Sequence, residues 1–283
     1  TDLVQEEGGT LDKYIGDAVV AMYGAPIALP DHAFRACVTA LRTQAGLERL
    51  RAKWAAEGER WPLAVRQMRS RIGLNSGPAI VGNMGSRSRF AYTMTGDNVN
   101  LAARMESGAK QWGVYIMCTA ATKTACEAHG GDRVRFRPLG SVVVKGRTQA
   151  VPLFEVFALK ENLTPEMDEC LTHFSAGLAH YRAREWDAAL ACFAQSRERE
   201  PYRPGRDVLH GIDLDVAAGE HMTDGLRLDG RGGLVALFEH SLQDGRGQIQ
   251  FFKFHVVDCT RPGRGVSACR RNRERVAEPV SGR

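Results

Sequence analysis

The chain has 283 residues, of which 43% are apolar and 25% charged, values typical of a soluble globular protein with one or two buried cores. Its net charge of +5 fits an anionic small substrate as well as a slightly basic surface, and no broad basic and aromatic strip predicts nucleic-acid binding outside residues 204–283. The chain opens without a secretory signal and lacks the roughly 18 to 20 consecutive apolar residues of a membrane span, so export and a membrane span in this segment are not expected.

The first predicted elements are a hairpin and a long helix. Residues 10–23 are expected to form two short strands around a turn at Gly16 and Asp17. Asp31 then stands at the N-cap position of a helix that should run to about residue 57. The helical spacing of the apolar residues supports this helix; they are Ala33, Cys37, Ala40, Leu41, Leu47 and Leu50.

The next region contains the most informative segment of the chain. Residues 71–81 are predicted as strand–turn–strand, with the turn at residues 75–78. Residues 89–106 have the sequence RFAYTMTGDNVNLAARME and are predicted as a strand, a turn and a helix capped by Asp97. Asn100 and Arg104 are four residues apart, so they project from one face of that helix. An amide beside a guanidinium suits a sugar oxygen and a phosphate; an incidental polar face is the alternative.

The remaining elements complete one domain and begin another. An α+β sheet domain is expected to end near residue 157, with a short helix at residues 120–128 and strands at 114–118, 134–136, 140–145 and 151–157. Residues 158–203 change to a helical pattern. The spacing there resembles a tetratricopeptide repeat at Gly177, Ala189, Phe193 and Pro201, with a plain helical hairpin as the alternative. Either structure must pack on something else, because one repeat cannot bury its apolar face alone.

Residues 204–283 are rich in glycine and arginine and contain few helical patterns. We expect this tail to be disordered or spurious, apart from one strand-like run at residues 248–257. Residues 208–220 are reminiscent of the strand before a phosphate-binding loop, but no GxxxxGK sequence follows.

The seven cysteines contain no CxxC pair, which argues against a disulfide framework or a zinc site. Five of them lie in apolar surroundings and are expected to be reduced core residues: Cys37, Cys118, Cys126, Cys170 and Cys192. A cytoplasmic location follows from this expectation.

The signature at residues 89–106 closely resembles that of class III nucleotide cyclases. Four further motifs occur in the family's order within about the first 157 residues: GGTLDKYIGDAVVAMYGAP, DHAFRACVTAL, RIGLNSGPAIVGNMGS and GSVVVKGRTQAVPLFEV. The resemblance implies a ferredoxin-like, palm-type sheet with flanking helices, incomplete at its N-terminus and followed here by a helical hairpin and a poorly defined tail. It implies attack of a ribose 3′-hydroxyl on the α-phosphate of a nucleoside triphosphate, with loss of pyrophosphate.

The same correspondence assigns metal-binding and purine-binding residues. Asp17 matches the second of two aspartates that hold two Mg²⁺ or Mn²⁺ ions, although alone it would be ordinary turn chemistry. Lys13 matches the position that recognises the purine, and lysine there goes with adenine because an ammonium can donate to N1. Thr93 replaces the commoner aspartate, as in a threonine-containing subgroup of bacterial adenylate cyclases, and its hydroxyl can accept from the 6-amino group.

Three further residues are assigned by the resemblance. Asn100 would orient the ribose, and Arg104 would stabilise charge at the α-phosphate. Lys145 would bind the terminal phosphates, although a lone lysine at a strand end is usually a solvated charge. Each site would be shared by two copies of the domain, so ATP, a homodimer and a protein partner on the repeat-like segment are the expected partners.

The family's first metal-binding aspartate is expected on a strand that precedes Thr1. We therefore expect a truncated domain with little activity alone, from a parent adenylate cyclase that acts in signal transduction. The main alternative is a catalytically dead module that binds a nucleotide or a partner. A GGDEF-type diguanylate cyclase is disfavoured because Gly8 and Gly9 continue as Thr10–Leu11–Asp12.

Overall fold

The computed structural model describes residues 1–143, 149–200, 226–228, 234–237 and 251–258, and every structural statement below concerns these residues. The elements in chain order are α1 (Asp2–Glu6), β1 (Thr10–Ile15), β2 (Ala18–Tyr23), α2 (His32–Ala56), the 3₁₀ helix η1 (Gly58–Arg60), α3 (Leu63–Arg66), β3 (Arg69–Ser76), β4 (Ile80–Gly85), β5 (Phe90–Thr95), α4 (Asp97–Gly108), β6 (Ile116–Thr119), α5 (Ala120–Gly130), β7 (Val134–Val143), β8 (Ala150–Leu159), the 3₁₀ helix η2 (Lys160–Asn162), α6 (Pro165–Ala183), α7 (Trp186–Glu198), β9 (Leu226–Leu228), β10 (Leu234–Leu237) and β11 (Phe251–Asp258).

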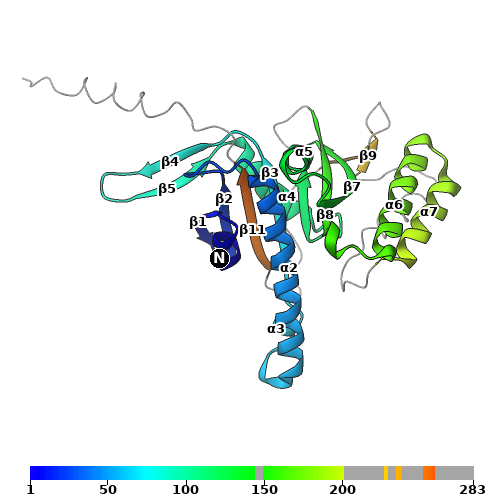
Figure 1. Cartoon of the computed structure of the whole chain (residues 1–283), viewed down its shortest axis with the longest axis horizontal. Helices are drawn as coiled ribbons and strands as arrows, with labels where there is room; N and C mark the ends of the chain where they lie inside the picture. Colours follow the sequence, from blue (N-terminus) through cyan, green and yellow to red (C-terminus); the bar gives the residue numbers. More distant parts are fainter. Residues whose placement is uncertain (144–148, 201–225, 229–233, 238–250, 259–283) are drawn as a thin grey trace, which may run out of the picture.

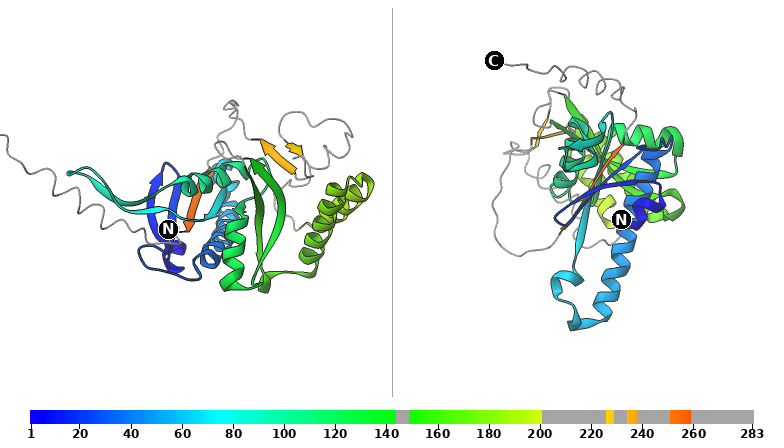
Figure 2. Two further views of the ribbon diagram at one scale, coloured as in Figure 1. Left: turned by 90° about the horizontal axis from the view of Figure 1, so that it is seen from above. Right: turned by 90° about the vertical axis from the view of Figure 1, so that its left-hand side faces the viewer.

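The strands form one mixed sheet and one separate arm. Within the described residues, nine strands pair in the order β1-β2-β11-β3-β6-β8-β7-β10-β9. Strands β4 and β5 pair only with each other, and Figure 2 shows them leaving the main sheet as a long ribbon. Helices flank the sheet, and the predicted α+β class is confirmed.

The last strand of the described residues lies in the middle of the sheet. Strand β11 is parallel to β2 on one side, where Val256 is opposite Ala21, and parallel to β3 on the other, where it is opposite Leu74. Figure 1 shows this strand between the two early strands. The strand-like run predicted at residues 248–257 is confirmed as β11, whereas residues 208–220 and the arginine-rich end lie outside the described residues.

Helices α2 and α5 cover one face of the sheet. Ile72 and Leu74 of β3 lie in one buried cluster with Phe34 and Cys37 of α2 and Cys126 of α5. Burying such side chains supplies the main driving force for placing these helices on the strand. The expectation of core cysteines is confirmed for Cys37, Cys118, Cys126 and Cys170, whereas Cys192 is half-buried.

Helix α4 and the hairpin of α6 and α7 share a second buried cluster. Met105 of α4 packs there with Met117 of β6, Leu153 of β8 and Phe174 of α6. At Gly177 an added Cβ would lie 2.6 Å from the ring of Phe193, so the two helices approach closely only because that position has no side chain. The predicted helical segment is confirmed, and its apolar face packs on the sheet and on α4.

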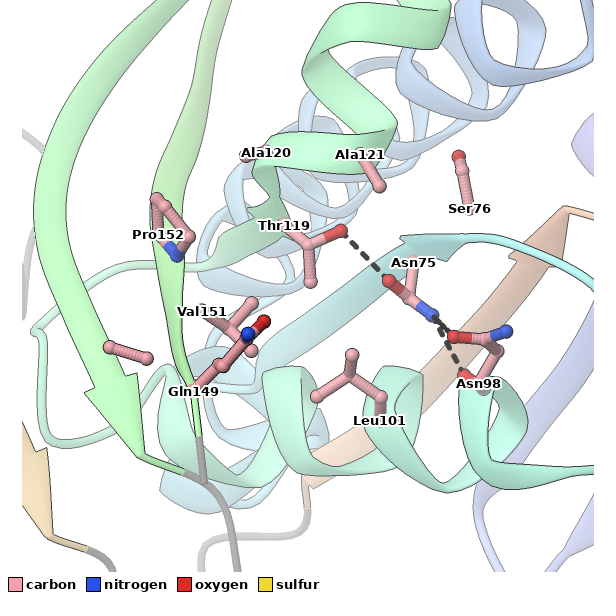
Figure 3. A pocket seen from close by; sticks show the side chains of 11 residues that line it. Asn75, Ser76, Asn98, Leu101, Thr119, Ala120, Ala121, Gln149, Val151 and Pro152 are labelled. Carbon is pink, nitrogen blue, oxygen red and sulfur yellow. Dashed lines mark hydrogen bonds between the residues drawn. The ribbon is translucent and has the colours of Figure 1, made fainter. Parts of the chain in front are cut away.

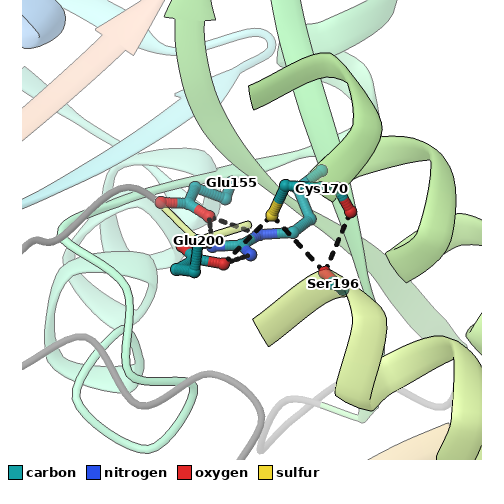
Figure 4. A network of polar contacts seen from close by, with 5 residues as sticks. Glu155, Cys170, Ser196 and Glu200 are labelled. Carbon is teal, nitrogen blue, oxygen red and sulfur yellow. Dashed lines mark hydrogen bonds and ion pairs between the residues drawn. The ribbon is translucent and has the colours of Figure 1, made fainter. Parts of the chain in front are cut away.

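A buried polar cluster also joins this hairpin to the sheet (Figure 4). Arg137 of β7 donates to Glu155 of β8 and to Glu200, which follows α7. The thiol of Cys170 lies 3.3 Å from Glu200 and 3.4 Å from the hydroxyl of Ser196. Sheet and hairpin therefore share hydrogen bonds as well as apolar contacts.

Several predicted boundaries were wrong. Asn75 and Ser76 belong to strand β3 and not to a turn, and β4 pairs with β5 instead of returning along β3. Gly96 occupies the N-cap of α4, and Asp97 is the first helical residue. The predicted strands at residues 134–136 and 140–145 are one strand, β7, as far as Val143.

The long helix was otherwise predicted correctly. Asp31 does precede α2, but its carboxylate accepts from Arg35 Nε at 2.9 Å and does not cap the helix backbone. Across the described ranges, every helix is too short or too polar to cross a lipid bilayer.

Candidate active site

Helix α4 presents the amide and guanidinium singled out in the sequence. Its buried residues include Leu101, Ala102 and Met105, which face the sheet and the second apolar cluster. Asn100 is exposed and Arg104 is half-buried, so both lie toward the edge or the outside of this buried face. The predicted helix is confirmed over Asp97–Gly108. Two residues four positions apart on such a helix lie on the same side of it.

Lys13 lies on β1 next to a buried carboxylate. The strand pairing with β2 is irregular between Leu11 and Lys13, so Asp12 is an extra residue at a bulge. The ammonium of Lys13 is 3.5 Å from a carboxylate oxygen of Asp12, whose side chain is 1% exposed. Among the described residues, neither oxygen of Asp12 has a hydrogen-bond partner. The lysine side chain itself is 45% exposed and can reach a ligand.

Thr93 offers a buried hydroxyl close to the same strand. It lies on β5 opposite Gly82, and strand β5 contacts β1. Its Oγ1 atom is buried and has no hydrogen-bond partner in the described part of the chain. Buried polar atoms are nearly always paired in folded proteins, so an unpaired one marks a place where a water or a ligand group fits. The structure thus places Lys13 and Thr93 on strands in contact.

Asp17 lies in the turn between β1 and β2 and is exposed. Within the described ranges, no group of three His, Cys, Asp or Glu residues is arranged to hold a metal ion. Mg²⁺ is nevertheless commonly bound by one or two carboxylates together with substrate phosphates and water. The Asp17 carboxylate therefore fits as one ligand of such a site, and the remaining ligands must come from elsewhere.

Lys145 lies outside the described residues. Of the predicted site residues, Lys13 and Thr93 lie on two strands that contact each other, β1 and β5, and Asn100 and Arg104 lie on α4, which directly follows β5.

A cavity of about 530 Å³ opens beside the first turns of α4 and α5 (Figure 3). Asn75, Asn98 and Thr119 point into this region and are linked by hydrogen bonds. Of the predicted site residues that the structure describes, none lines the cavity. Sequence reasoning missed this polar group, because Asn75 sits in a string typical of turns; the only signal was an asparagine at the end of an apolar strand.

In comparisons with known proteins, the first half of the chain matches a protein family. A family model for the adenylate and guanylate cyclase catalytic domain matches residues 2–160. Adenylate cyclase 1 of Rhizobium meliloti is 36% identical over 156 residues, which are 55% of this chain and 22% of that protein. The adenylate cyclase of Anabaena cylindrica is 31% identical over 157 residues, 55% of this chain and 29% of that protein. The chain thus spans less than a third of the length of these relatives.

Solved structures of similar proteins include the adenylyl cyclase CyaB from P. aeruginosa and the guanylyl cyclase Cya2. The first is 29% identical, with a TM-score of 0.47, and the likeness covers 58% of this chain and 79% of that one. The second is 30% identical, with a TM-score of 0.45, covering 57% of this chain and 76% of that one.

Proposed function

Because the chain belongs to the adenylate and guanylate cyclase catalytic-domain family, whose model matches residues 2–160, we propose that it takes part in converting ATP to 3′,5′-cyclic AMP and pyrophosphate. Two copies of the domain would combine to form each site. The single observation that carries the choice of ATP is the unpaired, buried hydroxyl of Thr93 on a strand that contacts the strand of Lys13.

Adenine and guanine differ in the hydrogen-bonding groups at N1 and at position 6 of the purine ring. Adenine has an acceptor at N1 and a donor at its 6-amino group, whereas guanine has a donor at N1 and an acceptor at O6. The Lys13 ammonium can only donate, and the Thr93 hydroxyl can accept from the amino group. Guanine fits this pair less well, because its N1 donor would face the Lys13 ammonium, which can only donate, and would be left unpaired.

Asn100 and Arg104 would act on the ribose and the α-phosphate. In the reaction the 3′-oxygen forms a bond to the α-phosphorus, the bond from that phosphorus to the bridging oxygen breaks, and the hydroxyl proton is lost. The amide of Asn100 would hold the ribose in position for this attack. The guanidinium of Arg104 would stabilise the negative charge that develops on the α-phosphate. Lys145 would contact the terminal phosphates.

Asp17 would contribute one carboxylate to bound Mg²⁺ or Mn²⁺. Such ions lower the pKa of a hydroxyl and neutralise the charge of a triphosphate. In the proposed dimer, Asp17 of one chain would face the remaining site residues of the other, which are Lys13, Thr93, Asn100, Arg104 and Lys145.

The arm of β4 and β5 supports a second copy of this chain as the partner. Ile80 is 66% exposed and Phe90 is 68% exposed, and Tyr92 is also open to solvent. Large apolar side chains exposed along a ribbon that leaves the sheet are typical of a protein–protein contact. A further protein partner on α6 and α7 is a prediction of the repeat-like sequence alone.

A second candidate is a domain that binds the nucleotide without cyclising it. It rests on the metal site, for which the resemblance assigns one carboxylate of the described residues, that of Asp17. The two candidates share the base and ribose contacts and differ only in turnover.

Binding and turnover should be measured separately. Affinities of the chain for non-cyclisable ATP and GTP analogues with Mg²⁺ come first, followed by cyclic nucleotide formation. The turnover assay should use this chain and any longer polypeptide that its coding sequence encodes. Preference for ATP with cyclic AMP formation supports the proposal. Preference for ATP without turnover in any form supports the second candidate, and absence of nucleotide binding contradicts both.

A further inference from the structure

Strand β3 has two rows of side chains that face different helices. Successive residues of a strand point to opposite faces, so Arg71, Gly73 and Asn75 lie in one row. The alternate row faces α2 and α5: Ile72 and Leu74 pack in their cluster, and the Ser76 hydroxyl donates to Thr122 at 3.1 Å. The row of residues 71, 73 and 75 therefore faces the opposite side of the sheet, where α4 lies.

Arg71 fixes the last turns of α4. Its Nε atom donates to Oε1 of Glu106 at 3.2 Å. The two residues are 9% and 1% exposed, so this ion pair is almost fully removed from water. Breaking such a pair leaves an uncompensated buried charge, which makes separation of the two groups strongly unfavourable.

Gly73 fixes how closely α4 approaches the sheet. A Cβ atom added there would lie 2.3 Å from the carbonyl oxygen of Ala102 and 2.3 Å from the backbone nitrogen of Glu106. These are backbone atoms of the helix, so no side-chain rotation can relieve the overlap. Only glycine at this position allows the helix to lie where it does.

Asn75 fixes the first turn of α4, as Figure 3 shows. Its Nδ2 atom donates to the carbonyl oxygen of Asn98 at 3.0 Å and to the Oδ1 atom of the same residue at 3.3 Å. Its own Oδ1 atom accepts from the hydroxyl of Thr119 at 2.8 Å. Asn98 in turn donates to the carbonyl of Pro78 at 2.8 Å. Asn75 is 2% exposed, so these bonds are shielded from water.

The three contacts fall on one line along the helix. Asn98, Ala102 and Glu106 are four residues apart, and positions at this spacing lie along one side of an α-helix. At 3.6 residues per turn, Asn100 and Arg104 are each two positions, or about 200°, beyond a contact point. They therefore lie on the side of α4 away from β3, and rotation of the helix on the strand would move both.

We propose that Arg71, Gly73 and Asn75, here called the β3 clamp, are positioning residues that set the rotation and height of α4 and thereby aim Asn100 and Arg104 at the nucleotide. The inference rests on the proposed function, since it assigns the role of residues that hold the ribose and phosphate contacts in place. The clamp residues act through α4 and need not touch the substrate.

A double-mutant cycle tests this coupling. Affinity for a non-cyclisable ATP analogue is measured for the unmodified chain, Asn75→Ala, Arg104→Ala and the double variant. If Asn75 positions Arg104, replacing Arg104 weakens binding strongly in the unmodified chain and by about fivefold less in the Asn75→Ala background. Thr119→Val should reproduce the effect of Asn75→Ala, because it removes the hydroxyl that orients the Asn75 amide.

Ser76→Ala is the matched control, since it removes a buried hydrogen bond from the other row of the same strand. The Arg104→Ala effect should be unchanged in that background. Equal losses from Arg104→Ala in the unmodified, Asn75→Ala and Ser76→Ala backgrounds would overturn the clamp while leaving the proposed function intact. Failure of the unmodified chain to bind the analogue would overturn the proposed function, and the clamp with it.

Discussion

Arg137 and Glu200 are 63 positions apart in the sequence, and Nη1 of the arginine lies 2.6 Å from Oε2 of the glutamate. Arg137 is fully buried on β7, and its Nε atom also donates to Glu155 at 2.8 Å. The guanidinium carbon lies 5.1 Å from the ring centres of both Phe157 and Phe174. One side chain thus joins strands β7 and β8 of the sheet to the helices that follow β8 in the chain.

Arg137→Ala should therefore destabilise the protein severely. Removing one partner of a buried ion pair costs about 3–5 kcal/mol, because the carboxylates of Glu155 and Glu200 would lose their compensating charge. The measurement is the free energy of unfolding in denaturant. The control is Arg135→Ala, whose pair with Asp168 is largely exposed and should contribute about 0–1 kcal/mol. Similar losses for the two variants would contradict this account of Arg137.

The Cys170 thiol predicts a loss of stability in alkali. Its burial and then the negative charge of Glu200 raise the pKa of Cys170 to about 11, from an ordinary value of 9.0. Between these two pH values the unfolded chain loses a proton that the folded chain keeps, so the free energy of unfolding falls as pH rises and is unaffected below that window. The check is unfolding at pH 8 to 11 for the unmodified chain and Cys170→Ala. An identical pH slope in the variant would refute the assignment.

Lys13→Glu should impair recognition of ATP. Hydrogen bonds to charged groups contribute about 1.5–3 kcal/mol, so affinity for a non-cyclisable ATP analogue should fall at least about tenfold. Lys110→Glu makes the same change of charge on an exposed turn after α4 and should alter affinity little. Equal losses of affinity in the two variants would mean that binding depends only on the overall charge of the protein. Unchanged affinity in Lys13→Glu would remove Lys13 from the site.

Phe90→Asp should weaken self-association. The ring is 68% exposed at the start of β5, and burying it in a dimer would contribute about 1.5–3 kcal/mol that a carboxylate cannot supply. Sedimentation should show a shift from dimer toward monomer. Leu63→Asp, at a residue 58% exposed on α3, is the control and should leave association unchanged. A dimer that survives Phe90→Asp would exclude the arm as the contact.

Proline substitutions can test whether β11 is a central strand. Val256→Pro introduces a residue that cannot donate to the ladder, at a position paired on both sides. Each buried group left unpaired costs about 1–3 kcal/mol, so the unfolding temperature should fall clearly. Arg227→Pro in β9, which pairs only with β10, should have a much smaller effect. Equal shifts would show that the β11 pairing contributes no more to stability than that of the edge strand.

The sequence predicted those elements that are determined by residues close together in the chain. The turn at Gly16 and Asp17, the helix after Asp31 and the pair Asn100 and Arg104 all follow from side-chain spacing and turn chemistry, and the structure contains each of these elements. The helical hairpin after residue 160 was predictable for the same reason.

What was missed depends on partners distant in the sequence. The string around Asn75 favours a turn locally, but pairing with β11 extends β3 through Ser76. The alternation of side chains along β7 gives no reason to bury Arg137, because its partner Glu200 lies far along the chain, after α7. The burial of the Thr93 hydroxyl likewise depends on how the arm lies near β1, which no neighbouring residue encodes.

The position of β11 also has a consequence for synthesis of the protein. A ribosome adds about 5–20 residues per second, so roughly 10 s or more would pass between the emergence of Ser76 and that of Phe251. During that interval the facing edges of β2 and β3 would have no strand between them, and unpaired edges readily recruit other chains. Nascent molecules of this protein should therefore depend on chaperones until β11 has emerged from the ribosome.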